Sequence, residues 1–151
     1  MYDIRDILSK GIMINEKKKE KYLKLQENSG DIRIRTLLGV FIRESVKEIA
    51  YINRMKENIT DQMAEAIDFS VFDKVSSLVN QFSRTIVPVR ITDRKVLLNH
   101  VLEQEKATYA LLIDIQGRLV TSPSPMSVDY YALLELIEEK SRYIEELKRM
   151  T

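Results

Sequence analysis

Four segments of this 151-residue chain have apolar residues spaced along one face of a helix, here called an apolar stripe, and each stripe has a polar residue near its centre. These four polar residues are the first candidates for chemistry. They are Glu16, Ser45, Glu105 and Lys140. Carboxylates and an ammonium that meet in a protein interior form ion pairs, whereas clustered carboxylates bind divalent cations. Composition restricts other chemistry. The absence of Cys excludes disulfides, thiolate metal sites and a cysteine nucleophile, and His100 is the only histidine.

The stripes that carry these residues have helical spacing and predict four long helices. We expect the first three over about 4–27, 32–57 and 93–115. A turn cluster at 28–31 separates the first two, so these must lie antiparallel. A loop at 122–125 holds two of the three prolines, and Ser127 or Asp129 after it can cap a fourth helix that ends at Met150.

Residues 58–92 have a different character from the four helical segments. They carry three of the four phenylalanines, Phe69, Phe72 and Phe82, on a shorter expected helix, and an extended stretch at 87–90 follows it. Because this segment is too apolar for a linker, we expect a crossover that packs across the outside of a bundle.

Residues 109–120 permit two interpretations: the end of the third helix, or a β-hairpin with Gly117 in its turn. The helix is favoured because the apolar stripe continues from Leu98 without a break, and a lone hairpin has only marginal stability. Together the elements predict a single all-α domain over 1–151. Its architecture would be an antiparallel four-helix bundle of two helical hairpins, with a long crossover that carries a short extra helix.

The two halves of the chain resemble each other. A shift of 89 residues places the third helix on the first and aligns Glu16 with Glu105, both of which are expected to face inward. A shift of 95 residues places the fourth helix on the second. It aligns Leu38 with Leu133, Ile42 with Ile137, Glu44 with Glu139, Ile49 with Ile144, Arg54 with Arg149 and Met55 with Met150.

Four segments resemble the ferritin-like superfamily, and within it the rubrerythrin-type helical pairs. They are 22–31 (YLKLQENSGD), 35–38 (RTLL), 105–110 (EKATYA) and 136–147 (LIEEKSRYIEEL). The resemblance implies a bundle whose centre holds two iron or manganese ions. In that family two helices each supply a Glu, and two supply a Glu followed three residues later by a His. Carried over, Glu16 and Glu105 match the single Glu positions, whereas the Glu-and-His pairs become Ser45 with Glu48 and Lys140 with Tyr143.

Both histidines of that ligand set are therefore replaced, which argues against an oxidoreductase and implies a degenerate di-metal site without a functional cofactor. An ammonium adds repulsion where the family places ligands. We expect Lys140 to pair with Glu16, Glu105 or both in a bundle-centre ion pair. The alternative is one residual iron or manganese ion held by Glu16, Glu48 and Glu105.

These considerations favour a non-catalytic helical protein that acts by association, as a homo-oligomer or with a protein partner. A rubrerythrin-like or ferritin-like protein that handles iron or oxidative stress is one alternative, and a nucleic-acid-associated helical protein is another. The net charge of +1 makes nucleic acid a poor partner. The lysine run Lys17–Lys19 does not change this, because charge runs on amphipathic helices are usually solvated faces and no aromatic residues are interleaved to stack on bases. No apolar run is long enough for a membrane span and no secretory leader is evident, so we expect a cytoplasmic protein.

Overall fold

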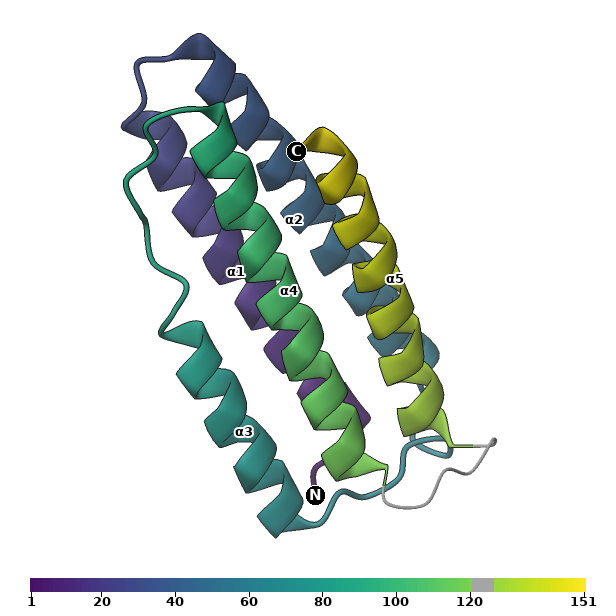
Figure 1. The fold of residues 1–151 in the computed structure, drawn as a ribbon. Helices are drawn as coiled ribbons and strands as arrows, with labels where there is room; N and C mark the ends of the chain where they lie inside the picture. Colours follow the sequence, from purple (N-terminus) through teal and green to yellow (C-terminus); the bar gives the residue numbers. More distant parts are fainter. Residues whose placement is uncertain (121–126) are drawn as a thin grey trace.

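The computed structural model describes residues 1–120 and 127–151, and they form an all-helical protein (Figure 1). The five helices are α1 (Ile4–Glu27), α2 (Ile32–Asn58), α3 (Phe69–Ser83), α4 (Arg94–Leu119) and α5 (Val128–Met150). The described residues contain no strand; the only extended pairing among them is an isolated bridge between Tyr2 and Ile67. The predicted helices are confirmed. The hairpin interpretation of 109–120 is wrong, because α4 continues through Leu119. The loop predicted at 122–125 lies outside the described residues.

Short polar side chains fix where the helices begin. Asp3 precedes α1, and its carboxylate accepts a hydrogen bond from the backbone N–H of Arg5 at 2.8 Å. Asp31 and Asp93 cap α2 and α4 in the same way, and Ser127 caps α5 by accepting from Tyr130 N–H at 3.3 Å. Each side chain satisfies a backbone donor that has no partner inside the helix.

Replacing Asp93 by Ala should lower the free energy of unfolding by about 1 kcal/mol, because the 2.9 Å bond from Val96 N–H to its carboxylate would be lost. Urea denaturation at neutral pH measures the change. Asp114→Ala on the same helix is the matched control, since Asp114 makes only an exposed ion pair with Arg118. Equal losses in the two variants would show that the cap contributes nothing.

The long helices pack as two pairs. α1 packs against α2 along its length, α4 packs against α5, and contacts across the centre join α1 to α4 and α2 to α5. α3 lies beside α1 and α4, against which it buries Val75 and Val79, and the extended residues that follow it run toward the start of α4 (Figure 1). The segment between α2 and α4 is therefore a crossover on the outside of the long helices, as predicted. No helix within the described ranges has both the length and the apolarity needed to cross a membrane.

The interior consists of two apolar clusters with a polar layer between them. One cluster, around Leu8, Ile52 and Leu133, lies toward the start of α1, and the other, around Leu38 and Leu97, lies toward its end. The buried residues between the clusters include polar and charged ones from all four long helices: Asn15, Lys18, Ser45, Glu105, Thr108 and Lys140. Buried charges must be paired if they are to be tolerated, so this layer is the place to look for a site.

Candidate functional site: a buried ion cluster

Glu105 is the centre of the polar layer. Its side chain projects from the middle of α4 and the residue is only 3% exposed. One carboxylate oxygen lies 3.2 Å from the ammonium nitrogen of Lys18 on α1, and the other lies 2.7 Å from that of Lys140 on α5. Burial alone would raise the pKa of Glu105, but the two ammonium groups lower it to about 2. Glu105 is therefore ionised at neutral pH, and from α4 it pairs with cations of α1 and α5.

Lys140 connects Glu105 to a second carboxylate. Its ammonium also lies 2.9 Å and 3.0 Å from the two carboxylate oxygens of Glu48 on α2. Lys140 is 2% exposed, and this burial favours the neutral amine. The charges of Glu105 and Glu48 outweigh that effect and hold the pKa of Lys140 above its usual value. The ring of Tyr143, one turn along α5, lies 5.6 Å from the same nitrogen, a distance typical of a cation–π contact.

Lys18 completes the cluster from α1. It is 1% exposed and donates hydrogen bonds to both oxygens of Glu105 and, at 2.9 Å, to the hydroxyl of Thr108. Burial lowers the pKa of Lys18, and the neighbouring charge of Lys140 adds to this effect against the attraction of Glu105. We name Lys18, Glu48, Glu105 and Lys140 the central ion cluster. With both lysines and both glutamates ionised, its net charge is zero.

A polar side branch extends from the cluster along α1 and α4. Lys21 is buried, and its nitrogen lies 2.6 Å from the side-chain oxygen of Gln104 and 2.9 Å from Nε2 of His100. Tyr22 donates to the same Gln104 oxygen at 3.2 Å. Within the described residues Lys21 meets no carboxylate, and burial lowers its pKa to about 7. The sequence places His100 off the apolar stripe, and the structure places it in this half-buried branch.

Acid should destabilise the folded protein through His100. Burial, with the charge of Lys21, lowers the pKa of this imidazole from 6.5 to about 4. Between these values the unfolded chain binds more protons, so stability falls as the pH drops from about 6.5 to about 4. The shift corresponds to at most about 3 kcal/mol, which solvent around this half-buried ring reduces to about 1–2 kcal/mol.

His100→Gln keeps a polar side chain and removes the titration. Urea denaturation of both proteins across this pH range should give a shallower loss of stability for the variant. Titrating groups remote from His100, such as Asp129, are common to both proteins and cancel in the difference. Lys21 contacts the ring, but with a pKa of about 7 it is mainly protonated over this pH range in both proteins. Parallel curves for the two proteins would contradict the assignment.

The structure brings together Glu48, Glu105 and Lys140, but it does not place Glu16 with them. The side chain of Glu16 is half exposed and pairs with Lys19 one turn away. Of the two partners expected for Lys140, Glu105 therefore forms the ion pair, and the pairing with Glu16 is wrong. The helical angle explains the difference, because the interior face of α1 runs through Leu8, Asn15, Lys18 and Tyr22 rather than through Ile12, Glu16 and Leu23.

The other positions carried over from the ferritin-like ligand set do not form a ligand set here. Ser45 is buried, and its hydroxyl donates to the backbone oxygen of Phe41 on its own helix. Glu16, Glu48 and Glu105 do not converge, and the described residues contain no group of three or more acidic or histidine side chains placed to hold a metal ion. An ammonium lies within 3 Å of both Glu48 and Glu105, where a cation between these carboxylates would have to sit. The residues present therefore do not fit a di-metal centre.

The lysine run of α1 does not form the solvated face that charge runs on helices usually form. Lys18 and Lys21 are buried, Lys17 donates to the backbone oxygen of Ser83, and Lys19 and Lys24 pair with acidic residues on α1. The sequence reasoning missed Lys18, the second cation of the cluster. Its signal was available, since Leu8, Asn15, Lys18 and Tyr22 follow one another at steps of seven, three and four residues, which keep to one face of a helix.

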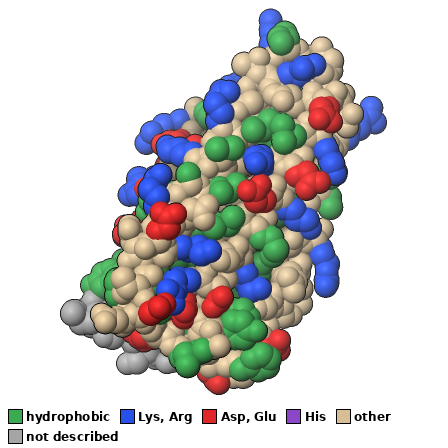
Figure 2. Space-filling model, turned by 180° about the vertical axis from the view of Figure 1, so that it is seen from behind, with side chains coloured by type: hydrophobic (Ala, Val, Ile, Leu, Met, Phe, Trp, Pro, Cys, Tyr) green, Lys and Arg blue, Asp and Glu red, His purple; other side chains and the backbone are tan. Residues whose placement is uncertain are grey.

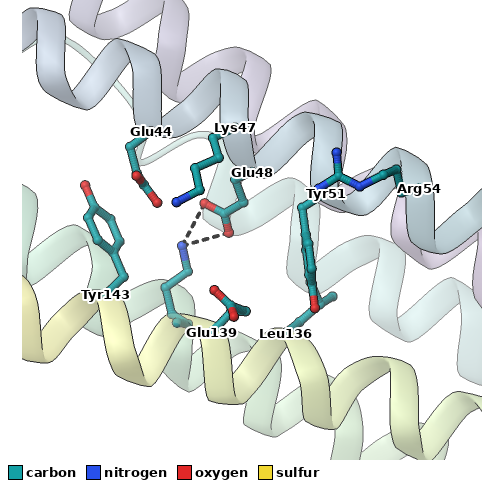
Figure 3. Close-up of a pocket in the computed structure, with 9 residues that line it drawn as sticks. Glu44, Lys47, Glu48, Tyr51, Arg54, Leu136, Glu139 and Tyr143 are labelled. Carbon is teal, nitrogen blue, oxygen red and sulfur yellow. Dashed lines mark hydrogen bonds and ion pairs between the residues drawn. The ribbon is translucent and has the colours of Figure 1, made fainter.

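A surface pocket of about 70 Å³ between α2 and α5 leads to the cluster (Figure 3). Figure 3 shows the two bonds from the α5 ammonium to the Glu48 carboxylate at its base. Acidic, basic and phenolic side chains alternate around it: Glu44, Lys47, Glu48, Tyr51, Arg54, Glu139, Lys140 and Tyr143. Burial raises the pKa of Glu44 above its usual value. The pocket thus presents both signs of charge, and Glu48 and Lys140 are the members of the cluster that it reaches.

Comparison of the chain with models of protein families, with curated proteins and with solved structures gives no match.

Proposed function

We propose that this chain is a non-catalytic ferritin-like four-helix bundle that acts by protein association, with the central ion cluster in place of a di-metal site. The observation that carries the proposal is the position of the Lys140 ammonium, less than 3 Å from both Glu48 and Glu105. A cation there would meet direct repulsion from this group and from Lys18. Two helical hairpins joined by a long crossover support the ferritin-like architecture.

Metal analysis tests the first part of the proposal. Protein expressed with added iron or manganese and then dialysed should retain no stoichiometric metal. Lys140→Ala, which leaves both carboxylates in place, is a useful companion, because it removes the competing ammonium. One or two equivalents bound by the unaltered chain would overturn the proposal and favour the iron-handling alternative.

The surface for association is proposed on the outer side of α1 and α2. Leu23 on α1 and Val40 and Val46 on α2 are exposed large apolar side chains. Figure 2, which views the molecule from behind relative to Figure 1, shows hydrophobic side chains among basic and acidic ones on that face. We place the contact with another protein at these exposed apolar side chains.

Self-association is the form of this proposal that can be measured directly. Sedimentation at several concentrations should show an oligomer of the unaltered chain that dissociates on dilution. The double variant Val40→Lys, Val46→Lys should be monomeric over the same range. Ile113→Lys, a change at an exposed apolar position on α4, is the matched control and should behave like the unaltered protein. A monomer at every concentration would contradict self-association.

A further inference from the structure

A small cavity lies between the helices next to the central ion cluster. Its volume is about 40 Å³, and side chains from all five helices line it. Most of the lining is aliphatic, for example Ile7, Ile52 and Leu133, and the polar contributions include Asn15 and Glu48. A cavity must offer about 10–15 Å³ to hold one water molecule, so this one has room for up to about three.

Asn15 supplies a polar atom that needs a donor at this cavity. The residue is buried, and its side-chain nitrogen donates to the backbone oxygen of Gly11 at 2.9 Å. Its side-chain oxygen is also buried, and no group within residues 1–120 and 127–151 donates to it. A buried acceptor without a donor is costly, and buried water is the usual partner of such an atom.

The cavity adjoins the surface pocket between α2 and α5. Glu48 and Leu136 line both of them. The carboxylate of Glu48 is held by Lys140, and about a fifth of the Glu48 side chain is exposed. These two side chains form the boundary between the cavity and the solvent-filled pocket, which gives a small molecule a short route inward.

We propose that the cavity is an internal water site, in which Asn15 is the anchoring acceptor and which exchanges with solvent past Glu48 and Leu136. The ligand must donate a hydrogen bond, because the Asn15 oxygen has no donor, and it should also accept one, because the Lys10 ammonium and the Thr108 hydroxyl belong to the lining. It must be neutral, because the charges of the cluster already balance. It must also be small, because the volume admits only a few atoms. Water meets all three requirements, and an apolar gas fails the first.

Two measurements test whether Asn15 anchors internal water. Magnetic relaxation dispersion measures how long water molecules reside in the protein, and a high-resolution crystal structure locates them. The unaltered protein should hold long-lived internal water, with electron density at hydrogen-bond distance from Asn15. Asn15→Leu removes the acceptor and fills the space, so about one long-lived water should be lost. Asn53→Leu, the same change at an exposed position of α2, should lose none. Equal water content in all three proteins would overturn the proposal.

Two further measurements test the route and the character of the cavity. Leu136→Ala widens the boundary, so the residence time of the water should shorten, and an unchanged residence time would show that exchange does not pass this residue. Xenon under pressure should leave the cavity of the unaltered protein unoccupied. Xenon bound against Asn15 would identify a dry apolar cavity and overturn the proposal, even if the Asn15 variant does not fold.

Discussion

Lys140→Ala should lower the free energy of unfolding by about 3–5 kcal/mol, because it removes the cation that two carboxylates share in the protein interior. Glu105 would keep only Lys18, at 3.2 Å instead of the 2.7 Å contact that is lost. Glu48 would lose its one ion-pair partner in the described structure, although it can still reach solvent. Urea and thermal denaturation at pH 7 measure the loss.

Two comparison variants separate the effect of the Lys140 charge on stability from the effect of its side-chain volume. Lys140→Met keeps much of the volume and should still be destabilising, since it leaves the same carboxylate unpaired. Lys148→Ala on the same helix removes an exposed lysine that pairs with Glu145 at 3.2 Å, and it should cost no more than about 0.5 kcal/mol. A loss for Lys140→Ala as small as that for Lys148→Ala would mean that the buried pairing does not contribute to stability.

The helices were predictable because their signals are local. Asp31, Asp93 and Ser127 mark where three of them start, and the apolar stripes of α4 and α5 lead directly to Glu105 and Lys140. Both of these central residues lie where aliphatic neighbours three and four positions away define the inner face. For such positions the sequence alone identifies both the element and the direction of the side chain.

The partners of Glu105 and Lys140 were harder to predict, for physical reasons. Lys18 stands between two other lysines, and such a run usually marks solvent, yet helical rotation turns the middle one inward. Glu48 lies at the edge of its inner face and reaches Lys140 because both side chains are long and flexible. Which long side chains meet across helices depends on how the helices are rotated and staggered, and that is a tertiary property.

Glu105→Gln should be as destabilising as Lys140→Ala, by about 3–5 kcal/mol, because it leaves a buried ammonium without its carboxylate, whereas Lys140→Ala leaves buried carboxylates without their ammonium. Lys140 would keep Glu48, but Lys18 would keep only the Thr108 hydroxyl and a neutral amide while fully buried. The pH dependence should change as well. The pKa of Glu105 is lowered to about 2, so its pairing stabilises the folded state above pH 4.5 and is lost as the pH falls toward 2. The variant should lack this acid-linked loss, and Glu103→Gln, an exposed change on the same helix, should retain it.

Replacing the three buried residues of the cluster in one protein tests whether the ion pairs make a net contribution to the free energy of unfolding. In the triple variant Lys18→Met, Glu105→Leu, Lys140→Leu no buried charge of the central ion cluster is left uncompensated, and Glu48 can turn to solvent. Replacing a buried ion network by apolar side chains of similar volume is often neutral or stabilising by about 1–4 kcal/mol, so this protein should be at least as stable as the unaltered one. The single variants would then report the cost of an unpaired charge rather than a net gain from the cluster. A triple variant as unstable as Glu105→Gln would instead show that the ion pairs themselves hold α1, α4 and α5 together.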